Sequence, residues 1–161
     1  MRTAAERLLE TYTVAADPAR SLPDEDQIAR EARALSDSGP AILATLLAGP
    51  ERPPGDSPAG RALAAWLRGF RRPAPHVGLH GCGAAARMFA LRIASETWPP
   101  LTQPLARQRA VLADQAAARP WRAEQVGWPD YDLITGAAGL LVAFAADPGA
   151  DAAARAPWWR T

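Results

Sequence analysis

Helix-length segments that are apolar on nearly every side alternate along this chain with segments that are apolar on one side only. The first kind occupies 41–48 (AILATLLA), 83–94 (GAAARMFALRIA) and 136–146 (GAAGLLVAFAA). A helix without a polar face must be buried on most of its sides, whereas an amphipathic helix keeps one side in water. The alternation therefore predicts inner helices that are covered by outer ones.

The amphipathic segments complete this pattern. They lie at 24–35, 59–70 and 104–118, and residues 1–16 form a further short amphipathic helix. The 16 prolines fall almost entirely between the segments, and four of them mark a Pro/Gly loop at 49–58. β-branched residues, which favour strands, are few. The pattern predicts an all-α fold.

Charge and composition exclude several classes of protein. The net charge of +1 gives no basic field that would favour nucleic acid. Glu6 and Glu10 lie where a signal peptide would have its apolar region, and the longest apolar run, 133–146, is shorter than the roughly 20 residues of a membrane span. A single cysteine fits a reducing compartment. We expect a cytoplasmic protein without a membrane span.

Each apolar segment follows a turn of small residues. These turns lie at 36–40, 80–83 and 134–139, and their glycines Gly39, Gly81 and Gly136 are about 40 to 55 residues apart. That spacing is typical of helical repeats, in which each hairpin of helices needs neighbours to bury its apolar helix. Periodicity leaves two geometries open, which are an open solenoid and a closed ring.

The segment 128–146, WPDYDLITGAAGLLVAFAA, carries the most specific motif. It resembles the lanthionine synthetase C-like family, the cyclases of lanthipeptide biosynthesis, in which an Asp-Leu-Ile-x-Gly-x-x-Gly run leads into an inner helix. Here that run extends from Asp132 to Gly139. The stretches 79–94 and 35–47 resemble the family's preceding inner helices, in the same order.

This resemblance implies a fold and a reaction. The fold is an α/α toroid, with an inner ring of apolar helices inside an outer amphipathic ring. The reaction adds a peptide cysteine thiol to dehydroalanine or dehydrobutyrine, and zinc binds and activates the thiolate. The family's motif aspartate takes part in the proton transfers, and by position it is Asp132, a candidate acid/base residue. The implied partner is a dehydrated precursor peptide.

The chain also departs from the family. The family's zinc is held by two cysteines and a histidine from the later part of the toroid, and no counterpart is present here. We therefore expect residues 1–161 to be a single incomplete domain, with zinc implied only for the complete domain and no cyclisation by this chain alone. The tail 147–161 would continue into a further helix. A second chain would complete the toroid, or the chain would self-associate.

Each candidate residue has a functional and a structural interpretation. Asp132 is either an active-site carboxylate or an N-terminal cap that accepts backbone N–H groups of the helix beginning near Gly136. A packing role is the expectation for Cys82, a hydrogen-bonded structural role for His80, and exposure in a Pro-rich loop for His76. The motif glycines are expected to serve turns and close packing; they are Gly39, Gly81, Gly136 and Gly139.

A second function also fits the sequence. A non-catalytic helical-repeat module would use the apolar wall of an incomplete ring to bind a peptide or a protein. The sequence itself does not distinguish this module from a cyclase fragment.

Overall fold

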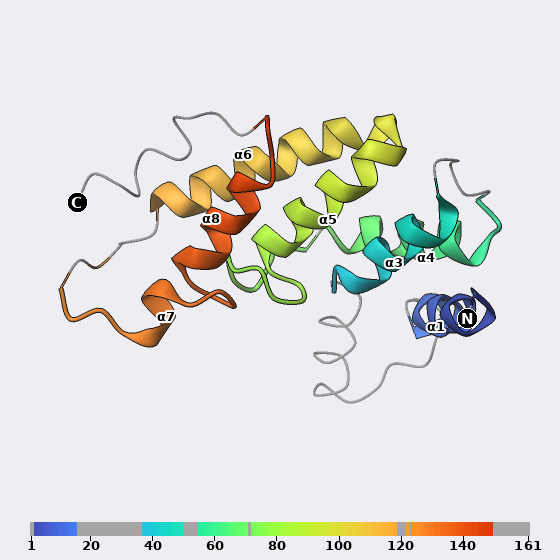
Figure 1. Ribbon diagram of the computed structural model, residues 1–161, viewed down its shortest axis with the longest axis horizontal. Coiled ribbons are helices and arrows are strands. Elements are labelled where there is room, and N and C mark those ends of the chain that lie inside the picture. The colour runs from blue at the N-terminus through green and yellow to red at the C-terminus, as the bar shows by residue number, and fades with distance from the viewer. Residues whose placement is uncertain are drawn as a thin grey trace.

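The computed structural model describes residues 2–15, 37–49, 55–70, 72–118, 122 and 124–149. Helices and the loops between them make up this part of the chain, which contains no strand, so the predicted all-α fold is confirmed (Figure 1). In chain order the helices are α1 (Arg2–Ala15), α3 (Gly39–Ala48), α4 (Pro58–Gly69), α5 (Ala84–Thr97), α6 (Thr102–Ala118), α7 (Trp128–Tyr131) and α8 (Ala137–Ala145), with a 3₁₀ turn at Pro99–Leu101.

The predicted segments match these helices closely. α3, α5 and α8 correspond to the three apolar segments, and α1, α4 and α6 to the amphipathic ones. Pro104 lies in the first turn of α6, where a missing N–H is tolerated. The short helix α7 was not predicted. The predicted helix 24–35 lies outside the described residues, as do 50–54 of the Pro/Gly loop and 150–161 of the tail.

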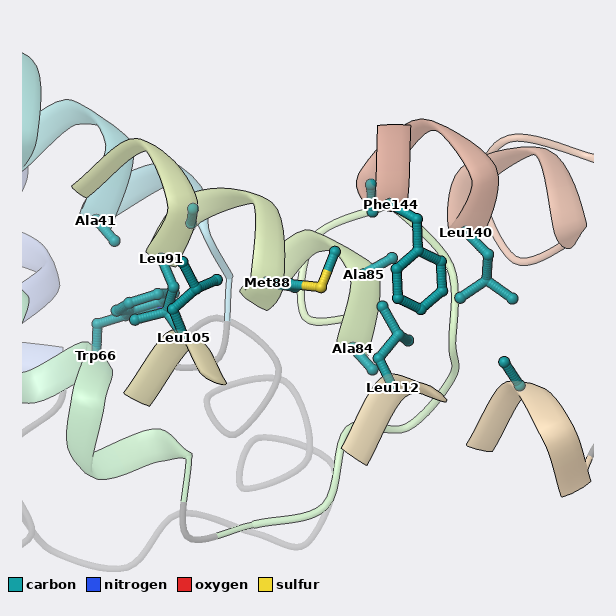
Figure 2. Close-up of a cluster of buried hydrophobic side chains, with 13 residues drawn as sticks. Ala41, Trp66, Ala84, Ala85, Met88, Leu91, Leu105, Leu112, Leu140 and Phe144 are labelled. Carbon is teal, nitrogen blue, oxygen red and sulfur yellow. The ribbon is translucent and has the colours of Figure 1, made fainter. Parts of the chain in front are cut away.

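The core is built around α5. Its small residues Ala84, Ala85 and Ala90 let neighbouring helices approach closely, and Met88 and Leu91 fill the space between those helices. α4 packs on α3, α6 packs on α5, and α5 lies between α3 and α8. Figure 2 shows the larger side chains that meet there, which are Trp66 from α4, Leu105 and Leu112 from α6, and Leu140 and Phe144 from α8.

Burial distinguishes α5 from the other two apolar helices. Most residues of α5 are buried, as the sequence predicts for a helix without a polar face. The same prediction is wrong for α3 and α8. Leu46 of α3 is 71% exposed, and Val142 of α8 is also exposed. Among the described residues only α5 has a neighbour of the repeat on each side, which explains the difference.

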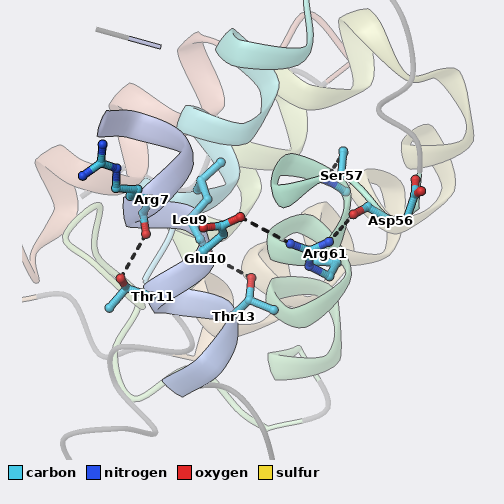
Figure 3. Close-up of polar contacts among 9 residues, drawn as sticks. Arg7, Leu9, Glu10, Thr11, Thr13, Asp56, Ser57 and Arg61 are labelled. Carbon is cyan, nitrogen blue, oxygen red and sulfur yellow. Dashed lines mark hydrogen bonds and ion pairs between the residues drawn. The ribbon is translucent and has the colours of Figure 1, made fainter. Parts of the chain in front are cut away.

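The N-terminal helix α1 covers α4 and part of α3. Leu9 is buried in this contact, and an ion pair joins Glu10 to Arg61 of α4, with 3.7 Å between Oε1 and Nη2 (Figure 3). α4 itself begins at a side-chain cap, because Ser57 Oγ accepts a hydrogen bond of 3.0 Å from the Gly60 N–H. None of the helices in the described ranges is long and apolar enough to cross a membrane.

A bidentate ion pair holds the end of α8 against α6. Arg109 donates from Nε to Asp147 Oδ2 at 2.6 Å and from Nη2 to Asp147 Oδ1 at 2.9 Å. Asp147 is buried, with 2% of its side chain exposed, and it also accepts the Gly149 N–H. The pair holds the C-terminal end of α8 against α6, although Val142 on another side of α8 is exposed.

We predict that Asp147→Ala lowers the free energy of unfolding by about 3 kcal/mol, because it leaves a partly buried guanidinium without its carboxylate. The matched control is Glu96→Ala, which removes the pair between Arg92 and a glutamate whose side chain is 61% exposed, and it should cost less than about 0.5 kcal/mol. Urea unfolding followed by circular dichroism measures both. Equal costs would contradict a structural role for the Arg109 pair.

Candidate functional site at the junction of three glycine turns

The three glycine turns lie side by side in the structure. The Ser38 N–H donates to the Gly81 carbonyl oxygen at 3.1 Å, and the His80 N–H donates to the Ile134 carbonyl oxygen at 3.4 Å. The turn before α5 is therefore bonded to the turn before α3 and to the turn before α8. We call the residues 37–39, 76–83 and 132–139 the glycine junction.

The loop 76–78 caps α5. The first N–H groups of a helix have no partner within the helix, and the N-cap residue Gly83 has no side chain to supply one. Instead, the amides of Ala84, Ala85 and Ala86 donate to the carbonyl oxygens of residues 76, 77 and 78, at 2.9, 3.0 and 3.3 Å. With these donors used, the start of α5 offers no free amides to a bound anion.

Two glycines of the junction permit close backbone contact. A Cβ atom on Gly78 would overlap the carbonyl group of Ile134, and one on Gly139 would overlap the Leu133 carbonyl oxygen and lie 2.9 Å from the Leu79 nitrogen. Gly139 thus packs closely against backbone of two loops. Gly78 was missed, since nothing in the sequence near it indicates a contact with residue 134.

The other motif glycines lie at or beside helix starts. Gly39 is the first residue of α3, and Gly136 is the N-cap of α8. Gly81 has a φ of +49°, a conformation that glycine adopts without strain. Gly81 therefore lies in a turn, whereas Gly39 and Gly136 lie where a turn meets its helix.

Asp132 is buried in the loop that leads into α8. Its Oδ1 accepts the amides of Ile134 and Thr135 at 2.6 and 2.7 Å, and its Oδ2 accepts the Thr135 hydroxyl at 2.8 Å. The structural interpretation needs a correction, because these donors belong to the loop and not to the first turn of α8. Asp132 shapes the turn that precedes the helix.

A second aspartate of the junction lies in the turn before α3. Asp37 is exposed, and its Oδ1 accepts the Gly39 N–H at 2.8 Å. Burial raises the pKa of Tyr12 in α1, and the negative charge of Asp37 raises it further. Sequence reasoning missed Asp37. Its spacing to Gly39 was the available signal, since an aspartate often accepts the amide two residues later.

The two histidines, His76 and His80, lie in the loop before α5. His80 is exposed. His76 was expected to be exposed but is half-buried, because its ring lies against Gly83 and its carbonyl caps α5. Burial lowers the pKa of His76, the charge of His80 lowers it further, and the charge of Asp132 opposes both. The Nδ1 atom of His76 is buried and has no hydrogen-bond partner within the described structure.

Cys82 is buried next to the N-cap of α5, as a packing role predicts. We tested whether the junction fits the zinc that the family resemblance implies. The parts of the chain that the structure describes contain no group of three or more His, Cys, Asp or Glu side chains placed to share a metal ion. These residues therefore do not fit the family's zinc.

Comparison with known proteins adds no relative: no family model, no curated protein and no solved structure matches this chain.

We predict that Gly78→Ala destabilises the fold by about 2 kcal/mol or more, because the new methyl group would meet backbone that cannot move aside easily. Gly55→Ala is the matched control, since a Cβ there has no atom within 4 Å. It should change the free energy of unfolding by less than about 0.5 kcal/mol. Thermal unfolding of the two variants tests this, and a tolerated Gly78→Ala would mean that the turns are further apart than described.

Proposed function

We propose that this chain is the N-terminal part of a lanthionine synthetase C-like cyclase domain, which closes thioether rings in a dehydrated precursor peptide. The observation that carries the proposal is the glycine junction. The three turns that resemble successive inner-helix starts of the family are hydrogen-bonded to one another in that order. The aspartate of the sharpest motif, Asp132, lies at this same junction.

The arrangement of helices supports the toroid that we propose. α3, α5 and α8 are packed in sequence and begin at one junction, and α4 and α6 pack on α3 and α5 (Figure 1). An inner ring with outer companions has this order, and so does a solenoid. The family resemblance is the reason to propose the ring.

In the proposed reaction Asp132 is the acid/base residue. Three donors hold its carboxylate in one orientation, which is the preorganisation that proton transfer to a bound substrate requires. The same hydrogen bonds also give Asp132 a structural role, so a test must separate rate from stability.

In this proposal, a separate polypeptide supplies the zinc ligands and the remaining helices of the toroid. The chain has one cysteine, and the family's site uses two cysteines and a histidine. We expect a partner polypeptide with a Cys and a Cys-His pair among further glycine-led apolar helices. Without it, the chain binds no zinc in the family manner and does not cyclise peptide.

A helical-repeat binding module is the second candidate function. Large apolar side chains around α7 are exposed to solvent: Trp128 is 69% exposed, and Tyr131, Leu133 and Ile134 are about half exposed. The Trp128 and Tyr131 rings contact each other edge to face, with centroids 5.4 Å apart. Exposed apolar groups of this size often mark an interface. A peptide, a second polypeptide or another copy of the chain would cover them.

The test is reconstitution. The purified chain is mixed with the zinc-ligand polypeptide and with a peptide that carries dehydroalanine and cysteine, and thioether formation is followed by loss of free thiol. We predict no reaction and no stoichiometric zinc for the chain alone, and cyclisation on mixing. Asp132→Asn should then lose at least about 100-fold in rate. Asp130→Asn is the matched control, because the Asp130 carboxylate accepts the amide of Gly127 at the start of α7.

Three outcomes decide between the candidates. Cyclisation on mixing supports the cyclase. Peptide binding by calorimetry without any cyclisation on mixing supports the binding module and contradicts the cyclase. Stoichiometric zinc on the isolated chain would contradict the assignment of the metal site to another polypeptide.

A further inference from the structure

Helix α8 is apolar all round, but the fold buries only one side of it. No residue of its sequence, AAGLLVAFA, has a polar side chain. Leu140, Ala143 and Phe144 are buried in the core. Val142 and Ala145, which helical periodicity places on the opposite side, are exposed. Because a helix without a polar face has to be buried on most of its sides, the open side of α8 needs a partner.

Large apolar side chains extend this open side beyond the start of α8. The helix α7 contacts α8 and lies away from α5 (Figure 1). Trp128 and Tyr131 of α7 are exposed, and so are Leu133 and Ile134 in the loop that leads into α8. We call the exposed apolar residues of 128–134 and 142–146 the α8 face.

The α8 face is bulky at one end and flat at the other. The bulky end consists of the two rings of α7 and the two aliphatic side chains that follow them. The flat end consists of Ala145 and Ala146, where α8 stops. If two copies meet with their α8 helices antiparallel, a two-fold axis across the helix places the bulky end of each copy over the flat end of the other. The face is therefore complementary to itself.

We propose that this chain forms a two-fold symmetric dimer through the α8 face, with the two α8 helices antiparallel. A second copy fits the change in side-chain size along the face, because each copy supplies both the bulky end and the flat end. The inference does not rest on the proposed function. In the cyclase, the polypeptide that completes the toroid would take the place of the second copy.

The area of the α8 face predicts how tightly the dimer is held. Large aromatic side chains have about 150 to 250 Å² each, so Trp128 at 69% exposure and Tyr131 at 51% leave roughly 200 to 300 Å² in water. Leu133, Ile134 and Val142 add a comparable area. Two copies would then bury about 1,000 Å² in total, which is near the lower limit for a specific interface. We therefore expect a dimer that dissociates on dilution.

The test is sedimentation velocity of the full chain over a range of concentrations. The unaltered chain should change from the mass of one chain to that of two and go no further, because a two-fold contact closes on itself. Val142→Asp should raise the dissociation constant at least about tenfold, since each copy would bury an uncompensated carboxylate. Leu46→Asp is the matched control, because it places the same charge on an exposed apolar residue of α3 and should leave the dissociation constant unchanged.

A second variant, Ala145→Trp, separates complementary packing from general hydrophobic attraction. A larger apolar side chain would strengthen a non-specific contact, whereas in the proposed dimer it meets the bulky end of the other copy. Ala145 is exposed, so a single chain has room for the ring. We expect the dissociation constant to rise at least about tenfold.

Several results would overturn the inference. One is a chain that stays monomeric at every concentration, which would leave the α8 face to a peptide or a different polypeptide. Others are association that continues past the dimer, a dimer that Leu46→Asp weakens and Val142→Asp does not, or a dimer that Ala145→Trp strengthens. Circular dichroism checks the folding of each variant, and Ala145→Trp remains informative if Val142→Asp does not fold. Cyclisation by the mixed polypeptides is measured separately, so the failure of the dimer leaves the cyclase standing.

Discussion

The structure depends on backbone hydrogen bonds that join the starts of its apolar helices. The loop 76–78 supplies the carbonyl groups that α5 needs for its first three amides, and the residues that follow it, His80 and Gly81, are bonded to the turns of α8 and α3. Because buried amides must be paired, this loop cannot be placed elsewhere without cost. It therefore fixes the start of α5, and α5 is the helix around which the core is packed.

This arrangement also brings three turns that carry titratable residues next to one another. Asp37, His80 and Asp132 lie on three successive turns that are far apart in the chain, and the helices behind them bring those turns together. A proton-transfer site needs fixed groups, and the hydrogen bonds around Asp132 fix its carboxylate. The structural and functional interpretations of Asp132 are thus compatible, and only rates can separate them.

The sequence predicts the helices well because their signals are local. Apolar runs, amphipathic stripes and prolines lie within each segment, and the helices at 41–48 and 104–118 follow from them. Gly139 was predicted to pack closely because its motif is local too. Gly78 was missed, since the Ile134 carbonyl that it accommodates belongs to a distant loop.

The burial of side chains and the partners of ion pairs were harder to predict, because they depend on segments that are distant along the chain. The half-burial of His76 depends on packing around the distant start of α5, and the partner of Arg109 is 38 residues away along the chain. Periodicity also overstated the burial of α3 and α8. It reports which residues of a helix are apolar, but it does not report whether a neighbour covers them.

Amide hydrogen exchange of residues 84–86 tests the central claim most directly. If the loop 76–78 accepts the first amides of α5, then Ala84, Ala85 and Ala86 should exchange about as slowly as the mid-helix amides of Met88 and Leu91. Exchange of these three amides at the rate of an exposed loop amide such as that of Gly55 would contradict the account.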